Sequence, residues 1–100
     1  MHTALRMKIN GIIWLESVID KLLWKHHVTT DEVEETFDRS PRYRFLAKGD
    51  VEGEHLYTAM GRTEAGRYLT VYFIYKATGE ALVISARDMT KKERKLYGKK

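Results

Sequence analysis

The stretch that most constrains the fold of this chain is residues 67–75, which read RYLTVYFIY. Its residues alternate between one set that includes Leu69 and Phe73 and another that includes Thr70 and Ile74. β-Branched and aromatic residues with a period of two, largely apolar in both sets, are typical of a strand inside a sheet. We therefore predict that residues 67–75 form an internal β-strand.

Further strands are predicted on both sides of this one along the chain. Residues 81–86 follow Lys76-Ala77-Thr78-Gly79, a short glycine-containing loop that favours a hairpin. Residues 42–47 and 54–60 also alternate between polar and apolar side chains. Together these segments predict a four-stranded antiparallel meander, to which residues 7–13 can add a fifth strand at the edge.

Three helices are predicted around the sheet. Residues 14–25 carry apolar pairs at helical spacing, Trp14/Leu15, Val18/Ile19 and Leu22/Leu23, which indicate one broad buried stripe. Thr29 with Glu32, and Thr90 with Glu93, have the spacing of capping boxes that start a second and a third helix. The second helix must end before Pro41. The expected fold class is α+β: N-terminal helices packed on a four- to five-stranded antiparallel meander, with a C-terminal helix, in a single domain over residues 1–100.

The charge distribution and the composition indicate which partners and which location to expect for this protein. The net charge of +4 lies in the second half of the chain, because the first fifty residues hold eight basic and eight acidic residues. Such a basic half suits nucleic acid or an acidic protein partner, although a solvated basic helix explains it equally well. The chain has no cysteine, no apolar run long enough to span a membrane and no signal peptide. We therefore expect a cytoplasmic protein without disulfides.

The predicted hairpins gather charge at one end of the sheet. The turn between the second and third meander strands carries Arg62, Glu64 and Arg67, and the last strand returns to this end with Arg87. The metal-site spacing HExxH, the nucleotide-binding spacing GxGxxG and the nucleophile elbow GxSxG are absent. This polar end is the best candidate for a site, while pairing of Arg87 with Asp88 or Glu93 remains an equal alternative.

The second half of the chain resembles a known family. Residues 61–75 (GRTEAGRYLTVYFIY), ISAR at 84–87 and MTKKERKLY at 89–97 are similar to the BrnT ribonuclease toxins of bacterial and archaeal toxin–antitoxin modules. Trp14, the pair His26-His27 and the acidic second helix extend the similarity toward the N-terminus. The resemblance implies a RelE-like fold, cleavage of RNA that blocks translation, and neutralisation by a DNA-binding antitoxin of the BrnA type. DNA would then be contacted only through the antitoxin.

Cleavage of RNA without a metal ion or another cofactor needs a base, an acid and cations that stabilise the charge on the phosphorane. Arginine suits the last role because its planar fork grips phosphate with two hydrogen bonds. Histidine titrates near neutrality, and Glu64 is the other possible base. Tyr97, eight residues after Met89 and one after Leu96, has a spacing that favours packing over catalysis. The residues predicted to be catalytic are Arg62, Arg87, Arg94, His26, His27, Glu64 and Tyr97, and those predicted to bind RNA are Arg67, Lys91, Lys92 and Lys95. The alternative is a non-catalytic RNA- or protein-binding module on the same fold.

Overall fold

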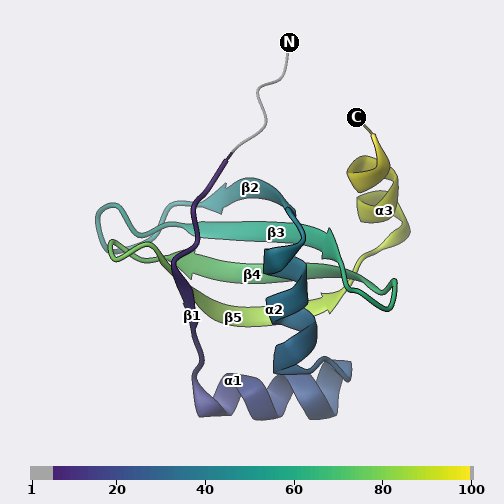
Figure 1. Cartoon of the computed structure of the whole chain (residues 1–100). Coiled ribbons are helices and arrows are strands. Elements are labelled where there is room, and N and C mark those ends of the chain that lie inside the picture. Colours follow the sequence, from purple (N-terminus) through teal and green to yellow (C-terminus); the bar gives the residue numbers. More distant parts are fainter. Residues whose placement is uncertain (1–5, 100) are drawn as a thin grey trace.

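The computed structural model describes residues 6–99, which form one five-stranded sheet with helices on both of its faces (Figure 1). The elements in chain order are β1 (Gly11–Ile13), α1 (Glu16–Lys21), the π-helix η1 (Leu22–His26), α2 (Thr30–Asp38), β2 (Arg42–Ala47), β3 (Leu56–Arg62), β4 (Tyr68–Tyr75), β5 (Glu80–Asp88) and α3 (Lys91–Gly98). The predicted α+β class is confirmed. Among residues 6–99 no helix is long and apolar enough to cross a membrane.

The sheet is mixed, which corrects the prediction of a purely antiparallel one. Its strand order is β1-β5-β4-β3-β2, and β2 to β5 form the predicted antiparallel meander. The edge strand β1 instead runs parallel to β5, with Gly11 opposite Glu80 and Ile13 opposite Leu82. Alternation within a three-residue strand carries no information about its direction.

Contacts with the β4–β5 hairpin set the direction of β1. The backbone N–H of Asn10 donates to the Gly79 carbonyl at 2.9 Å, and its side-chain amide donates to the Thr78 carbonyl at 3.1 Å. The hydroxyl of Tyr75 donates to the Lys8 carbonyl at 2.8 Å. Because β1 and β5 both begin beside this hairpin, they run in the same direction.

The first predicted helix is present, but its second half is a π-helix and not an α-helix. Residues 16–21 are α-helical, and residues 22–26 continue as a π-helix, which fits an extra residue into the turn. Leu22 is buried, whereas its neighbour Leu23 is 56% exposed and Trp24 is 71% exposed. The prediction of one broad buried stripe is therefore wrong at Leu23, because the wider turn directs that side chain to solvent, and at Leu15, which precedes α1 and is 45% exposed.

The predicted helix starts and stops are confirmed. Thr29 accepts a hydrogen bond from the Glu32 backbone N–H at 3.2 Å, while the Glu32 carboxylate accepts from the Thr29 backbone N–H at 3.1 Å. The same reciprocal box joins Thr90 and Glu93 at the start of α3. Helix α2 ends at Asp38, before Pro41.

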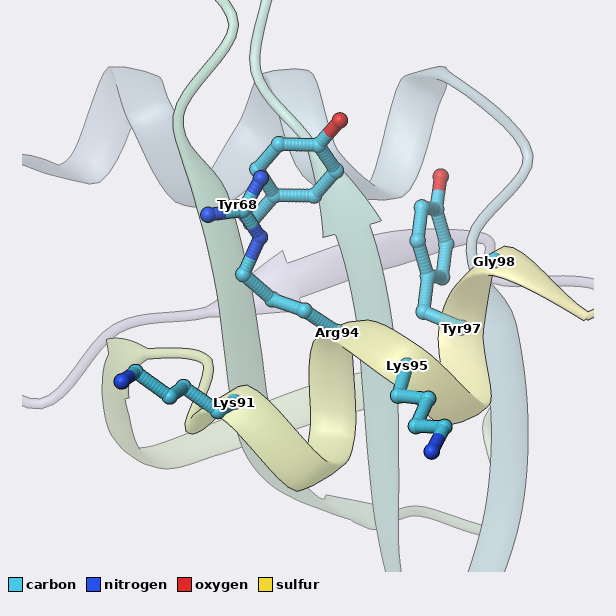
Figure 2. A pocket seen from close by; sticks show the side chains of 6 residues that line it. All are labelled: Tyr68, Lys91, Arg94, Lys95, Tyr97 and Gly98. Atoms are coloured by element: carbon cyan, nitrogen blue, oxygen red, sulfur yellow. The ribbon is translucent and has the colours of Figure 1, made fainter.

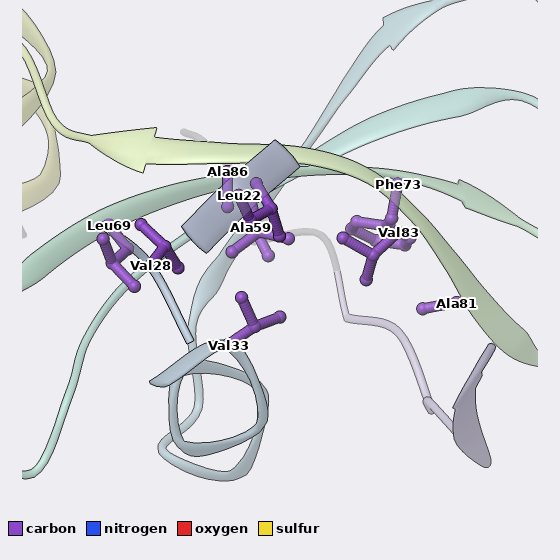
Figure 3. Packing of buried hydrophobic residues seen from close by; sticks show 10 residues of the cluster. Leu22, Val28, Val33, Ala59, Leu69, Phe73, Ala81, Val83 and Ala86 are labelled. Atoms are coloured by element: carbon purple, nitrogen blue, oxygen red, sulfur yellow. The ribbon is translucent and has the colours of Figure 1, made fainter. Parts of the chain in front are cut away.

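The two faces of the sheet carry different side chains. Leu69, Val71 and Phe73 of β4 are fully buried on the face that α1, η1 and α2 cover, and they pack there with Leu22 and Val33 (Figure 3). The alternate residues of β4, beginning with Tyr68, point to the opposite face, where the ring of Tyr68 meets Tyr97 of α3. Helix α3 therefore lies on the second face, at one end of the sheet.

Candidate functional site

The register of β3, β4 and β5 places three arginines at one end of the sheet. Arg62 lies opposite Tyr68, and Arg87 lies opposite Thr70 two residues further along β4. Arg67 immediately precedes β4, after a turn in which Gly66 has a φ of 95°, a value that favours glycine. A Cβ at Gly66 would lie 3.1 Å from the Arg62 guanidinium, so the turn brings Arg62 close to the backbone beside Arg67. These arginines nevertheless occupy different environments.

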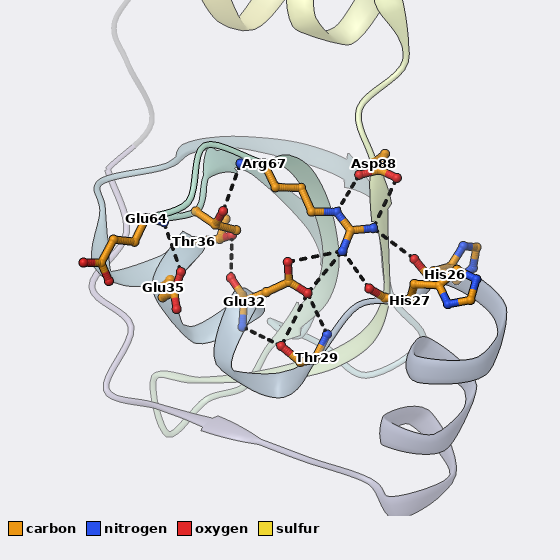
Figure 4. A network of polar contacts seen from close by, with 10 residues as sticks. His26, His27, Thr29, Glu32, Glu35, Thr36, Glu64, Arg67 and Asp88 are labelled. Atoms are coloured by element: carbon orange, nitrogen blue, oxygen red, sulfur yellow. Dashed lines mark hydrogen bonds and ion pairs between the residues drawn. The ribbon is translucent and has the colours of Figure 1, made fainter.

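Arg67 is the centre of a polar network on the helix-covered face (Figure 4). Its Nε and Nη2 donate to the two carboxylate oxygens of Asp88 at 2.7 and 3.2 Å. Nη1 donates to the Glu32 carboxylate at 3.1 and 3.2 Å. The carbonyl oxygens of His27 and His26 accept from Nη1 and Nη2 at 2.7 and 3.0 Å. All five N–H donors of the guanidinium are therefore engaged within the protein.

This network joins three parts of the chain that are distant in sequence. Arg67 ties β5, through Asp88, to the first turn of α2 and to the end of η1. His27 ends η1 in the left-handed conformation, with a φ of 55°, which turns its carbonyl and that of His26 toward Arg67. The guanidinium holds the pKa of the Asp88 carboxyl below its ordinary value, mainly through the hydrogen bonds between them. Arg67 is thus a structural residue that holds these elements together. Its positive charge is already neutralised by the carboxylates of Asp88 and Glu32.

The positive charge of Arg87 is also neutralised by a carboxylate, on the opposite face of the sheet. Its guanidinium donates to both carboxylate oxygens of Glu93 at 2.6 and 3.0 Å and to the hydroxyl of Tyr72 at 2.6 Å. The pair fixes the start of α3 against β5 and lowers the pKa of Glu93 to about 2, mainly through the Arg87 hydrogen bonds. Of the two acids predicted as partners, Glu93 holds the side chain, whereas Asp88 accepts from Arg87 through its backbone carbonyl at 3.1 Å.

Arg62 and Arg94 have aromatic partners instead of acidic ones. The guanidinium carbon of Arg94 lies 4.2 Å from the centre of the Tyr68 ring, and that of Arg62 lies 5.3 Å from it. The ring of Tyr97 meets Tyr68 edge to face, with the centroids 6.0 Å apart. Among residues 6–99, no carboxylate forms an ion pair with Arg62 or Arg94, and both side chains belong to exposed residues.

A shallow cavity opens beside the rings of Tyr68 and Tyr97 (Figure 2). It has a volume of about 410 Å³ and is lined by Tyr68, Lys91, Arg94, Lys95, Tyr97 and Gly98. A neighbouring cavity of about 350 Å³ is lined by Gly66, Arg67, Tyr68, Asp88, Met89 and Arg94, so Tyr68 and Arg94 border both. Three cations and two phenol rings around one depression can hold a phosphate group and an adjoining aromatic base. We call the first depression the cationic cavity.

The remaining predicted residues lie at varying distances from the cationic cavity. Tyr97, Lys91 and Lys95 line it, but Lys92 does not. The imidazoles of His26 and His27 lie on the other side of Arg67 and Asp88 (Figure 4).

Glu64 forms no ion pair with an arginine among residues 6–99. Its backbone N–H donates to the Glu35 carboxylate at 3.0 Å, and its own carboxylate points away from Arg67. No acidic or imidazole side chain lines the cationic cavity. Within the described range, residues 6–99, no group of three or more His, Asp or Glu side chains is arranged to hold a metal ion.

Tyr68 is a site residue that the sequence did not single out. It is one of three tyrosines in residues 67–75, yet it joins Arg62, Arg94 and Tyr97 in one cluster. A signal did exist: the hairpin register that follows from the turn at residues 63–67 places Tyr68 directly opposite Arg62.

Comparison with known proteins gives a family. The model of the ribonuclease toxin BrnT of type II toxin–antitoxin systems matches residues 14–93, which include every element from α1 to β5 and the start of α3. A comparison with curated protein sequences gives no match. A match over most of the chain places it in this family, whose type implies an antitoxin as partner. The chain belongs to the BrnT family of ribonuclease toxins of type II toxin–antitoxin systems.

Proposed function

We propose that this protein is a metal-independent endoribonuclease that cleaves RNA, thereby inhibits translation, and binds RNA in the cationic cavity. We further propose a RelE-like fold, a cytoplasmic location, a single domain over residues 1–100 and a BrnA-like antitoxin that binds DNA. Family membership supports the ribonuclease class. The cavity supports the placement of the RNA.

The observation that carries this placement is the contrast in charge compensation among the arginines. Arg62 and Arg94 lie over an aromatic ring with no acid paired to them among residues 6–99. A phosphodiester can therefore approach both cations without displacing a carboxylate. The aromatic ring fixes the guanidinium groups while it leaves their N–H donors available.

The proposed roles follow from these positions. Arg94 and Arg62 stabilise the negative charge that develops on the phosphorane oxygens, while Lys91 and Lys95 bind the flanking phosphates. Tyr97 is the candidate proton donor inside the cavity. Arg87 acts indirectly, because its bond to Glu93 positions the helix that carries Arg94.

The base is proposed to be His26 or His27. The charge of His26 contributes to the lowered pKa of the Asp88 carboxyl, and Asp88 lines the cavity that Arg94 also borders. Neither imidazole lines one of the two cavities, so the proposed base lies beyond Asp88 as seen from the cationic cavity. Glu64 is the other candidate base, although its carboxylate points away from Arg67. Lys92 is proposed only to bind RNA, outside both cavities.

The direct test uses purified protein and a labelled single-stranded RNA in excess EDTA. We expect cleavage products from the native protein, loss of cleavage in Arg94→Ala, and unchanged cleavage in Arg39→Ala. Arg39 is a matched control because it caps the C-terminal end of α2, on the opposite face of the sheet from α3. Growth arrest on expression should follow the same order. Cleavage that needs an added metal ion contradicts the metal-independent mechanism.

One observation favours the alternative, a non-catalytic RNA-binding module. The cationic cavity itself contains no imidazole or carboxylate that could act as a general base. Salt-dependent RNA binding without any cleavage product, lost in Arg94→Ala, would support this second function.

A further inference from the structure

The face of the sheet opposite α1 and α2 has two ends with different chemistry. Residues opposite one another on neighbouring antiparallel strands point to the same face. Leu56, Ile74 and Leu82 are aligned in this way across β3, β4 and β5. They point to the same face as Tyr68, because Ile74 is an even number of residues from Tyr68 along β4. We call these three residues the apolar row.

The apolar row is outside the hydrophobic core. The core cluster and the partly buried side chains packed against it include Tyr57 and Phe73, which point to the helix-covered face, but none of the three residues of the row. Each residue of the row is partly exposed. An aliphatic row on a solvent-facing sheet surface is unusual, because such a surface normally carries polar residues.

Helix α3 covers only the other end of this face. Its contacts with the sheet include those of Tyr97 and Arg94 with Tyr68, and that of Glu93 with Arg87. The row formed by Met60 and Thr70 next to these contacts is buried. Between that row and the apolar row lies a polar one, Thr58, Tyr72 and Ser85, which is buried only at Thr58.

Along β2 the uncovered part of this face is bordered by positive charge, whereas on β5 the same face carries Glu80, two residues before Leu82. Arg44 lies opposite Thr58 and Arg42 opposite Met60, both on the edge strand β2 and both exposed. Arg44 has no hydrogen-bonded acid among residues 6–99, and Arg42 only approaches the Leu96 carbonyl at 3.5 Å. The cationic cavity continues this positive border along α3.

We propose that the uncovered face binds an acidic amphipathic helix of the antitoxin. Apolar side chains at one end of such a helix would pack on the apolar row, and its acidic residues would face Arg44, Arg42 and the cations of α3. A helix is favoured over an added strand, because the apolar side chains lie on the face of the sheet and not along its edge. RNA is not the expected occupant, since a row of aliphatic side chains offers nothing to a phosphate backbone.

The dimensions allow one such helix to block the RNA site. Ile74 and Tyr68 are six residues apart on β4, a distance of about 20 Å along a strand. A helix of about 13 residues has this length. Because the apolar row crosses β3, β4 and β5, a helix laid along β4 covers the row with one end, where its width of about 10 Å spans the neighbouring strands, and reaches the cationic cavity with the other end. The blocking step rests on the proposed function; the docking surface itself does not.

The test measures the affinity of the full-length toxin for the antitoxin encoded by the adjoining reading frame, by calorimetry. Leu82→Glu and Arg44→Glu should each weaken binding at least tenfold, because each places a negative charge against an acidic helix. The matched controls are Leu23→Glu on the exposed side of η1 and Arg39→Glu at the end of α2, which should bind as the native protein does. Circular dichroism verifies that every variant is folded.

Other outcomes overturn the inference in distinguishable ways. Equal affinity for all four variants excludes this face, and loss of binding only in Leu23→Glu places the interface on η1. A toxin dimer that Leu82→Glu disrupts identifies a second copy of the chain as the occupant. Loss of RNA binding in Arg44→Glu, with antitoxin binding intact, identifies RNA. A protein that binds antitoxin through this face but never cleaves RNA refutes the proposed function and leaves the inference standing.

Discussion

Arg67 and Arg87 differ from Arg62 and Arg94 in what surrounds their charge, although all four lie at the same end of the molecule. The first two are held by carboxylates, with nitrogen–oxygen distances as short as 2.7 Å for Arg67 and 2.6 Å for Arg87. The other two lie over Tyr68, without an acidic partner among residues 6–99. The comparison shows that an arginine near a site does not necessarily bind the substrate or take part in catalysis. An arginine whose donors are already satisfied stabilises the fold, and one whose donors are available can bind a substrate.

The largest expected effect is on catalysis by the arginines without acidic partners. Arg94→Ala should lower the rate of RNA cleavage by about 10²–10³, the typical loss when one stabilising contact to a developing oxyanion is removed. The same change should lower the free energy of unfolding by less than about 1 kcal/mol, since it removes only an exposed cation–π contact. Single-turnover cleavage assays and urea unfolding measure the two effects. A large loss of stability with little loss of rate would mean that Arg94 is a structural residue, as Arg67 and Arg87 are.

The second effect is on stability and concerns Arg67. Arg67→Ala removes the guanidinium that donates to two carboxylates and two backbone carbonyls, which should lower the free energy of unfolding by about 2–4 kcal/mol. Arg67→Lys should recover only part of this loss, because an ammonium group cannot form the two parallel bonds that Asp88 receives. Urea unfolding with an unchanged m-value measures the difference. Native stability in Arg67→Ala together with lost RNA binding would assign Arg67 to the substrate instead.

The third effect is a dependence on pH. The pKa of Glu93 is about 2 in the folded protein, against an ordinary value of 4.5. The stabilisation from its pair with Arg87 is therefore complete above about pH 4.5 and is lost as the pH falls toward about 2. Glu93→Gln should lower the free energy of unfolding by about 1–2 kcal/mol at neutral pH and should flatten its decline in this range. Urea unfolding between pH 2 and 6 measures both curves, and parallel curves would show that the pair contributes nothing.

Much of the fold could be predicted because its determinants are local. The alternation over residues 67–75, the capping boxes at Thr29 and Thr90, and the stop before Pro41 each depend on a few neighbouring residues. The direction of β1 could not be predicted, because contacts of Lys8 and Asn10 with a hairpin more than sixty residues later determine it.

The division of the arginines into two pairs could be predicted only in part, since the pairing of Arg87 with Glu93 was one of the stated alternatives. That Arg67 meets Glu32, thirty-five positions away, depends on how α2 packs on the sheet. A pattern of charge along the sequence identifies where cations gather. It does not show which of them an acid from a distant element will neutralise.

The smallest expected effect tests whether the Tyr68 ring positions the available arginines. Tyr68→Leu removes the π-face under Arg94 and Arg62, whereas Tyr68→Phe keeps the ring and removes only the hydroxyl. A cation–π contact at an exposed site contributes about 0.5–1 kcal/mol. If this energy holds the guanidinium groups in their reactive position, Tyr68→Leu should lower the cleavage rate by about two- to fivefold, while Tyr68→Phe should cleave at the native rate. Single-turnover assays on both variants give the comparison. Equal loss in the two variants would mean that the hydroxyl, and not the ring, is the group that matters. No loss in either would mean that Arg62 and Arg94 reach the phosphate without support from Tyr68, and that lack of an acidic partner alone sets the two pairs of arginines apart.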